Sequence, residues 1–528
     1  VSISSDVAPQ IREYERTSTT VANAYVTPLA DSYLDLMSRE IAGLGIEAPL
    51  FMMLSNGGLT HVDEAKRAPI QLLESGPAAG ALAGSYFGTR AGEPDVLAFD
   101  MGGTTAKLAI VLKGEPMIAY SFEASREKRF AAGSGLPINI STIELIEIGA
   151  GGGSIAAIDT LALLKVGPQS AGAAPGPACY GRGGTLPTVT DANLVLGYLD
   201  AAAFAGGTIA IDSAKAQAAI APLARQAGVS VPELAWGIHS VVNENMAAAA
   251  RVHIAERGHH AGEFALLVTG GGGPLHGCEV ARRLGISKLV CPPSAGVASA
   301  LGLLMAPARV DRVSTIAKRL SAMDWAALET AYVALEQEAQ VVIAATLAGN
   351  PAVKVERTAD LRFVGQGFEV VTVMPGGPYA VSSAQPIQNA FEAEYRKVFG
   401  LVPPAGEVEI INIRVAVTAA AVSDELKVPA GSAGRQAEPK ARRQAWSGAD
   451  SAFVEMPVYD RYALGVGARV EGPAIVEEAS STLILPRASV ATVKPSGSLV
   501  VELSVKAADG AGVTTEKFQT AIEGASAA

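Results

Sequence analysis

Residues 96–112 read VLAFDMGGTTAKLAIVL. Two apolar runs, Val96–Phe99 and Leu108–Leu112, lie on either side of a Gly-Gly pair. Short apolar runs bounded by glycine are typical of buried strands joined by a tight turn. The segment therefore predicts two neighbouring strands, and the chain from residue 1 to about 312 continues as alternating strand and helix patterns of an α/β fold.

The turn between these strands has the composition of a phosphate-binding loop. Gly102 and Gly103 let the backbone turn tightly with exposed N–H groups, and the hydroxyls of Thr104 and Thr105 add donors. Such donors can hold phosphate oxygens. Asp100, at the end of the first strand, can bind Mg²⁺ or orient a water molecule. The alternative interpretation is an ordinary hairpin without a ligand, because Gly-Gly is common there.

A second glycine run, Gly270–Gly273, follows the predicted strand Phe264–Val268 and precedes a helix that ends near Leu284. A strand, a glycine run and a helix N-terminus together form a geometry suited to nucleotides. The alternative is close packing of strand and helix. Four consecutive glycines exceed what packing normally requires, which favours a ligand site. His276, directly after the run, is the one histidine that we treat as a functional candidate.

A third glycine segment, Gly149–Ser154, includes Gly151 and Gly152 as candidate cleft residues. Further along the chain, Asp191 is a candidate metal ligand or general base. Its alternative role is to cap the helix predicted around Leu194–Leu199.

Composition excludes several classes of function. The 528 residues carry 41 basic and 52 acidic side chains, a net charge of −11. A nucleic-acid or anionic membrane partner would need a concentrated positive surface, so neither is expected. Glycine makes up 56 residues, about 11% against an average near 7%. Three cysteines are too few for a disulfide framework. The sequence also contains no apolar run of bilayer length and no recognisable signal peptide, and we expect a cytoplasmic protein.

The pattern changes near residue 313. We predict an α/β domain over 1–315, a smaller β-rich α+β domain over 316–505 and a flexible tail over 506–528. Within the second domain, the segment 423–443 is rich in Pro, Gly, Ala and charge and is predicted to be a long loop.

The order of the motifs resembles the hydantoinase A/5-oxoprolinase family, which also includes acetone and acetophenone carboxylase subunits. The matching segments are LLESGPAAGA (72–81), FDMGGTTAK (99–107), IGAGGGSIA, SAGAAPGPACYGRGG, PTVTDANLVLG, GGGGPLHG and SAGVASALGLL (294–304). The resemblance covers nearly the whole chain and continues through Arg362–Gln366, Asn412–Arg414 and Gly472–Glu477.

The resemblance implies a fold of the actin/sugar-kinase/Hsp70 type, with an ATP site between two ribonuclease-H-like lobes. Asp100–Lys107 would be the second phosphate loop and Gly270–Gly273 the adenosine loop. The lobe that carries the first phosphate loop has no counterpart here, so we expect it on another chain or on a longer form of this one. Lys107 departs from the aspartate of many relatives, and its positive charge suits phosphate.

The resemblance also implies an activity. Members use ATP and Mg²⁺ (or Mn²⁺) to phosphorylate a carbonyl oxygen, and they work with a hydantoinase B-type partner in a hetero-oligomer. The first expectation is a cyclic-amide hydrolase, the alternative is a ketone carboxylase subunit, and the third is a scaffold without catalysis. We assign catalytic roles to Asp100 and Asp191 and the metal to Asp100. Nucleotide contacts are assigned to Gly102, Gly103, Thr104, Thr105, Lys107, Gly151, Gly152, Gly270, Gly271, Gly272, Gly273 and His276.

Overall fold

The computed structural model describes residues 1–126, 133–347, 351–404, 406–419 and 437–504. The chain forms two compact units that alternate along the sequence. Unit 1 comprises Val1–Ala79, Ile118–Ile143 and Leu304–Asp424, and unit 2 comprises Gly80–Met117, Glu144–Leu303 and Glu425–Ala528. These units group residues by contact, whereas the predicted domains follow chain order, and the domain ranges stay a prediction. The predicted tail lies outside the described residues.

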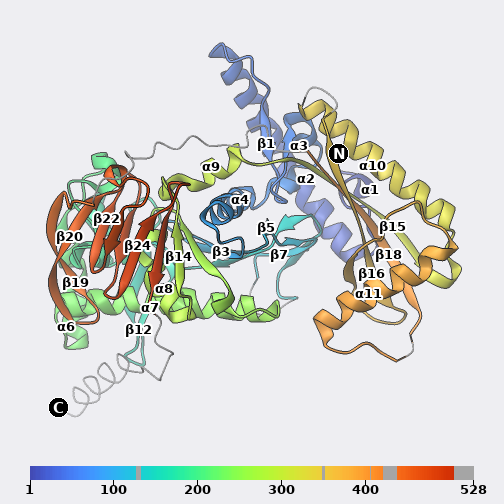
Figure 1. Ribbon diagram of the computed structural model, residues 1–528. Helices are drawn as coiled ribbons and strands as arrows, with labels where there is room; N and C mark the ends of the chain where they lie inside the picture. Colours follow the sequence, from blue (N-terminus) through green and yellow to red (C-terminus); the bar gives the residue numbers. More distant parts are fainter. Residues whose placement is uncertain (127–132, 348–350, 405, 420–436, 505–528) are drawn as a thin grey trace. The chain divides into compact units, whose positions relative to one another are not determined.

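Unit 2 is built on a nine-stranded sheet with the order β10-β4-β3-β13-β14-β25-β24-β21, and β5 pairs with β4. β3 and β4 pair antiparallel, which confirms the predicted pair of strands, and β13 runs parallel to β3. Both inner strands are buried almost throughout, as their continuous apolar sequences require. The strands are β3 (Val96–Met101), β4 (Ala106–Leu112), β5 (Glu115–Pro116), β10 (Leu145–Ile148), β13 (Ala265–Thr269), β14 (Lys288–Cys291), β21 (Arg469–Glu471), β24 (Ser489–Val493) and β25 (Leu499–Leu503) (Figure 1).

Helices of unit 2 share one large apolar core with this sheet. The longest, α7 (Val231–Glu256), begins with a capping box in which Ser230 and Glu233 satisfy each other's backbone N–H groups. The other helices of this core are α5 (Val189–Val195), α6 (Ser213–Ala227) and α8 (Gly273–Leu284). The unit also contains α4 (Ser75–Ala91, which enters the unit at Gly80) and α9 (Ala298–Leu304).

Two smaller sheets complete unit 2. One pairs β11 (Ser154–Ile158) with β12 (Leu164–Ser170), and the other has the order β19-β20-β22-β23. Their remaining bounds are β19 (Ala441–Ser447), β20 (Ala452–Asp460), β22 (Ala474–Glu477) and β23 (Thr482–Leu485). The loop predicted over 423–443 is wrong at its end, because β19 begins at Ala441. Residues 423–436 of that prediction lie outside the described residues.

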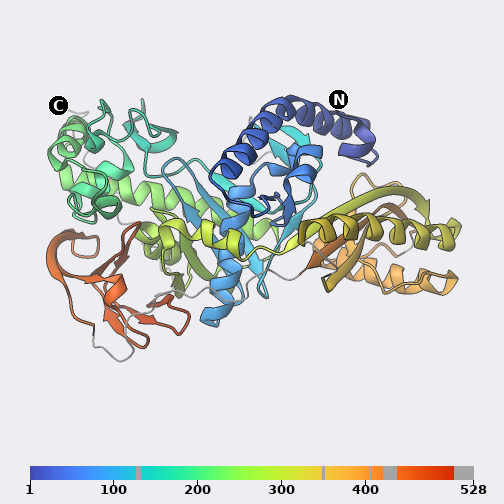
Figure 2. The same ribbon diagram turned by 90° about the horizontal axis from the view of Figure 1, so that it is seen from above.

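Unit 1 is built on a six-stranded sheet with the order β1-β2-β15-β18-β16-β17. Helices α10 and α11 pack on one face of it (Figures 1 and 2). Their apolar stripes meet Ile413 and Val415 of β18 in a second core. The strands are β1 (Phe51–Met53), β2 (Leu59–His61), β15 (Ala308–Arg319), β16 (Val353–Phe363), β17 (Val370–Val373) and β18 (Val408–Ala419). The helices are α1 (Ser4–Val7), α2 (Glu13–Gly43), α3 (Val62–Arg67), α10 (Trp325–Leu347) and α11 (Ala384–Phe399).

The opposite face of the unit 1 sheet is polar and nevertheless buried. On β18, Asn412 and Arg414 alternate with the apolar residues of the core, as the period of two in a strand requires. Arg414 and Asp360 of β16 form a buried ion pair on this face. The residues 118–143 add two short pairings, β6 (Ile118–Ala119) with β9 (Thr142–Ile143) and β7 (Phe122–Ala124) with β8 (Leu136–Ile138).

Candidate functional site

The turn after β3 and the segment Gly149–Ser154 pack directly against each other in unit 2. The Gly152 N–H donates to the Gly102 carbonyl at 3.1 Å, and the Gly153 N–H donates to the Gly103 carbonyl at 2.6 Å. The Thr190 N–H and hydroxyl both donate to the Gly152 carbonyl at 2.8 Å. Two glycine segments that are about fifty residues apart in the sequence therefore form one continuous loop structure.

The glycine run after β13 joins the same structure. The parallel register of β13 and β3 places Thr269 beside Asp100. The Gly272 N–H then donates to the Met101 carbonyl, and the Gly270 N–H donates to the Ala295 carbonyl, both at 2.9 Å. All three predicted glycine segments thus meet around the carboxyl end of β3, the edge where ligands bind in α/β sheets.

Close backbone approach explains why glycine is required here. A Cβ on Gly151 would lie 2.6 Å from the carbonyl carbon of Thr104. A Cβ on Gly270 would lie 2.3 Å from Asp100 Oδ1, and Gly270 also has a φ of +80°. Residues other than glycine rarely adopt a positive φ of this size. Packing therefore accounts for both glycines without a ligand, so their nucleotide-binding role stays a prediction.

The tip of the β3–β4 turn keeps free donors. Gly102, Gly103 and Thr104 are exposed. Within the described part of the chain, the N–H groups of Gly103 and Thr104 donate to no protein acceptor. Exposed, neighbouring backbone N–H groups are the donors that phosphate oxygens accept from.

Asp100 is partly buried beside this tip. Its Oδ2 accepts a long hydrogen bond from Ser299 Oγ of α9 at 3.5 Å. Burial raises the pKa of Asp100, and the positive charge of Lys107 partly opposes that rise. Lys107 is the direct cross-strand partner of Asp100, and its Nζ lies 3.5 Å from Glu147 and 3.4 Å from Thr105 Oγ1. An incompletely solvated carboxylate next to free backbone donors is a candidate catalytic group.

Asp191 has a different environment. It is fully buried at the third position of α5, and Thr188 and Asp191 form a capping box. Its carboxylate accepts from the N–H groups of Ala178, Cys179 and Thr188, at 2.8–3.3 Å, and from the Thr188 hydroxyl at 2.7 Å. These four bonds favour the capping alternative over the catalytic assignment, because they occupy the lone pairs that a metal or a proton would need.

His276 does not face the glycine loops as a donor. It is buried in α8, where Nε2 pairs with Asn193 Nδ2 at 3.0 Å and Nδ1 with Asn243 Oδ1 at 2.7 Å. Burial lowers the pKa of His276 to about 3, so the ring is neutral. His239 stacks on it with ring centroids 4.5 Å apart. His276 thus joins α5, α7 and α8 behind the glycine loops, and a direct nucleotide contact by it stays a prediction.

Sequence reasoning missed this network and a second one on the far side of the loops. Glu478 accepts from the N–H groups of Ser294 and Ala295, at 3.0 and 2.7 Å, and from Ser481 Oγ at 2.7 Å. It thereby fixes the segment whose carbonyl receives the Gly270 N–H. The SAGVASALGLL motif includes one half of this contact, and the matching segment Gly472–Glu477 ends one residue before the other half. Neither segment indicated that the two meet.

The site could hold a divalent cation that is bound mainly by a nucleotide and by one carboxylate of the protein. Among the described residues, no group of three His, Cys, Asp or Glu side chains is placed to hold a metal. Mg²⁺ needs fewer protein ligands than that, because it keeps waters and binds through one or two carboxylates plus the phosphates of its nucleotide. Asp100 supplies such a carboxylate beside the phosphate-type donors, so the residues present suit a nucleotide-bound magnesium ion rather than a dedicated metal site.

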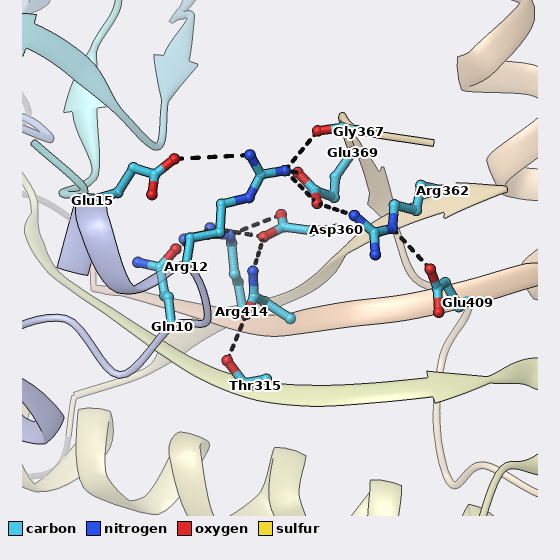
Figure 3. A network of polar contacts seen from close by, with 11 residues as sticks. Gln10, Arg12, Glu15, Thr315, Asp360, Arg362, Gly367, Glu369, Glu409 and Arg414 are labelled. Atoms are coloured by element: carbon cyan, nitrogen blue, oxygen red, sulfur yellow. Dashed lines mark hydrogen bonds and ion pairs between the residues drawn. The ribbon is translucent and has the colours of Figure 1, made fainter. Parts of the chain in front are cut away.

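Unit 1 contains a polar cavity of about 60 Å³, lined by Gln10, Asn56, Tyr120, Asp311, Thr358 and Arg414 among others. One lining residue, Arg414, takes part in a buried ion pair with Asp360. Arg414 donates to both oxygens of Asp360 (Figure 3). Its guanidinium also stacks over the Tyr120 ring, 4.2 Å from the ring centroid. Neighbouring pairs on the same face join Arg12 and Arg362 to Glu369. Of the lining residues, Arg414 belongs to a segment that carries the family resemblance, but the sequence did not predict a cavity here.

Comparison with known proteins finds family models over two consecutive ranges of the chain. A family model described as hydantoinase/oxoprolinase matches residues 16–312, and one for the hydantoinase/oxoprolinase C-terminal domain matches residues 316–495. An uncharacterized protein of Methanocaldococcus jannaschii is 37% identical, over 94% of this chain and 72% of its own length. Caprolactamase subunit alpha of Pseudomonas jessenii is 32% identical, over 91% and 68%, respectively.

Two further matches concern chemistry and fold. The acetophenone carboxylase gamma subunit of Aromatoleum aromaticum is 29% identical, over 95% of this chain and 69% of its own. The crystal structure of ATP-dependent caprolactamase from Pseudomonas jessenii superposes with a TM-score of 0.79 at 30% identity, over 95% of this chain and 72% of that one. These matches confirm the predicted fold class, an α/β architecture of the actin-like ATPase type. Among the described residues, no helix has the length and apolar composition to cross a membrane.

Proposed function

This chain belongs to the hydantoinase/oxoprolinase family, and from that premise we propose that it is the ATP-using subunit of an enzyme that opens cyclic amides. Its relatives include a caprolactamase subunit and an acetophenone carboxylase subunit. The proposal therefore assigns it the amide branch of that chemistry, with a hydantoinase B-type subunit as the partner. The amide substrate itself is left open.

The observation that carries the proposal is the meeting of three glycine segments around the end of β3. Their mutual hydrogen bonds fix the loops, and the Gly103 and Thr104 N–H groups remain free at the tip. Packing explains the glycines of the inner loops, but it gives these two N–H groups no acceptor. The oxygens of a polyphosphate accept from such neighbouring backbone donors. The Thr104 and Thr105 hydroxyls extend the same donor set.

The chemistry follows from what these groups can hold. Bound magnesium–ATP would supply the phosphoryl group that makes an unreactive amide carbonyl susceptible to water. The protein's part is to position and to stabilise charge. The turn donates to phosphate oxygens, Lys107 adds a positive charge at the base of the turn, and Asp100 offers its carboxylate to the metal or to an aligned water.

The ketone carboxylase alternative has one observation in its favour. The match to the acetophenone carboxylase subunit covers 95% of this chain. Both reactions would use the same phosphate site, so the residues of the glycine loops do not separate them. The substrate that stimulates ATP hydrolysis does.

The test is ATP hydrolysis by the enzyme purified with its native partner. We expect stimulation by hydantoin, 5-oxoproline or caprolactam, with release of the ring-opened acid. Stimulation by acetone or acetophenone with bicarbonate, and by no cyclic amide, would replace the proposal with the carboxylase. A complete assembly that binds no ATP, measured by calorimetry with magnesium–ATP, would leave the scaffold role.

A further inference from the structure

Helix α2 of unit 1, the long dark-blue helix in Figure 2, has its polar side turned inward. Thr19 is fully buried, and its hydroxyl accepts from the Asn139 N–H at 2.9 Å. Asn23, also buried, accepts from the Ile70 N–H at 3.1 Å and donates to Ser2 Oγ at 3.0 Å. The helix is therefore held to its unit partly by hydrogen bonds rather than by an apolar stripe alone.

The outward face of α2 carries six large apolar or aromatic side chains. Its large side chains are widely exposed: Tyr14 65%, Val21 62%, Tyr25 85%, Leu29 76%, Tyr33 59% and Leu36 48%. The spacing of these residues by seven, four, four, four and three positions places them along one side of the helix. No charged residue occurs between Arg16 and Asp31. We call these six side chains the α2 stripe.

This arrangement is the reverse of a surface helix, which normally turns its charged residues to water. The three tyrosines alone leave roughly 400 Å² in solvent, if each carries about 200 Å² of surface. Apolar surface of that extent on one helix is comparable to the largest apolar patch of a typical monomer, and such patches are often functional. Tyrosine at the centre of such a patch is typical of protein interfaces. A lipid surface is disfavoured, because α2 carries five acidic residues and only two basic ones, whereas helices that lie on membranes are rich in Lys and Arg.

The length of the relatives indicates what covers the stripe. This chain matches along 94% and 91% of its length, but that accounts for 72% and 68% of the two relatives. Each relative therefore carries more than a quarter of its length outside the shared region, which is enough for a folded domain. We propose that the α2 stripe is the docking surface for a folded domain corresponding to that remaining part of the relatives.

The proposed interface has a centre and a rim. Tyr25 and Leu29 are the most exposed members and lie one turn apart, so they are the expected anchors in a pocket of the partner domain. Tyr14 and Leu36 lie at the ends of the stripe. A standard interface buries about 800 Å² on each side, so the domain would cover the stripe together with neighbouring residues of unit 1.

The test uses a photo-reactive benzoylphenylalanine at position 25 in the assembled protein, followed by mass spectrometry of the cross-linked peptides. The matched control places the same group at Val341 of α10, which is 69% exposed in the same unit. We expect position 25 to cross-link to a peptide that aligns with the unshared part of the relatives, whether on this polypeptide or on a separate one. Position 341 is expected to give no such product.

Every other result overturns the proposal. A cross-link to the same stripe on a second copy would make it a self-association surface. A cross-link to unit 2 or to a B-type partner would identify a different occupant, and the absence of any protein cross-link would show an uncovered face.

A pair of substitutions measures the energetic contribution. Tyr25→Ser with Leu29→Ser is expected to lower retention of that domain at least tenfold, while the thermal midpoint of the chain stays within about 2 °C, since both side chains already face solvent. Val341→Ser should change neither. Retention at the wild-type level in the double variant would contradict the docking role.

Discussion

Asp100 and Asp360 are both carboxylates on inner strands, but they differ in how many hydrogen bonds they accept. In unit 1, Asp360 accepts from Arg414 Nε and Nη2, at 3.0 and 2.8 Å, and from Asn412 Nδ2 at 2.8 Å. In unit 2, Asp100 contacts Ser299 Oγ at 3.5 Å and has a raised pKa because it is partly buried. A saturated carboxylate stabilises a fold, whereas an under-satisfied one carries a cost that function can explain.

The residues around the two carboxylates also differ in how fully their polar groups are hydrogen-bonded. The polar face of the unit 1 sheet satisfies buried charges with side chains, and its cavity is lined by groups already engaged with each other. The glycine loops of unit 2 satisfy one another through the backbone and leave two N–H groups at the tip unbonded within the described residues. Matched substitutions in the two regions should therefore have opposite consequences.

The largest effect is expected from Asp100→Ala. ATP hydrolysis should fall at least a hundredfold, because the carboxylate that faces the phosphate-type donors is removed. The fold should remain, since few contacts are lost. Circular dichroism and thermal melting accompany the rate measurement, and wild-type turnover by a folded variant would exclude the catalytic assignment.

The pKa direction adds a check on the same residue. A carboxyl group whose folded pKa is raised contributes stability while it is protonated, and that contribution is lost as pH rises through the folded pKa. At neutral pH, Asp100→Asn is therefore expected to be at least as stable as the wild type while remaining inactive. A clear loss of stability in Asp100→Asn would show a structural role instead.

Asp360→Ala should show the reverse. It leaves the guanidinium of Arg414, 9% exposed, without its carboxylate. Breaking a buried pair in this way costs about 3–5 kcal/mol. We expect a large drop in the free energy of unfolding in urea, and normal affinity for magnesium–ATP in whatever fraction stays folded. The double variant Asp360→Leu with Arg414→Met should recover much of the stability, and a double variant as unstable as the single one would argue against the pair as the cause.

The features of this fold that could be predicted from the sequence are those that depend on residues close together in the chain. The glycine runs could be recognised directly, because glycine is the residue that permits the close backbone approach found at Gly151 and Gly270. The strands β3 and β4 and the capped start of α7 were predictable for the same reason, since each depends on neighbours in the chain. The assignment of the chain to its family came from the order of these local motifs.

Contacts between distant segments were not predictable in this way. The Asp360–Arg414 pair joins residues 54 positions apart, and the side chains of Asn193, Asn243 and His276 meet only after three helices have packed. From a single sequence, polar residues on these strands and helices would be predicted to face solvent. The start of β19 was missed because Ala441–Arg443 continues a charged, alanine-rich segment, and its pairing with β20 decides the structure.

The buried histidine gives an intermediate effect that depends on pH. The pKa of His276 is lowered to about 3 by burial. A base with a lowered folded pKa contributes stability above its unfolded pKa, near 6.5, and loses it as pH falls toward the folded value. The wild type should therefore lose a few kcal/mol of stability between pH 6.5 and pH 4, on the order expected from linkage.

The matched variant is His276→Gln, whose amide can replace one hydrogen bond but cannot titrate. It is expected to be less stable than the wild type at pH 7 and to depend less steeply on pH over the same range. Parallel curves of melting temperature against pH for the two proteins would show that His276 is not the group responsible.

The smallest effect is expected from Lys107→Met, and it probes the site rather than the fold. The ion pair of Lys107 with Glu147 spans 3.5 Å, and the two side chains are 26% and 50% exposed. Such pairs contribute about 1 kcal/mol or less, so stability should barely change. The Lys107 charge, however, lowers the pKa of Asp100 from across the strand pair. Removing it should raise that pKa further and move the acid limb of the ATP hydrolysis profile to higher pH. A lower rate with an unmoved acid limb would instead assign Lys107 to phosphate binding alone, because losing a phosphate contact weakens nucleotide affinity without changing how Asp100 titrates.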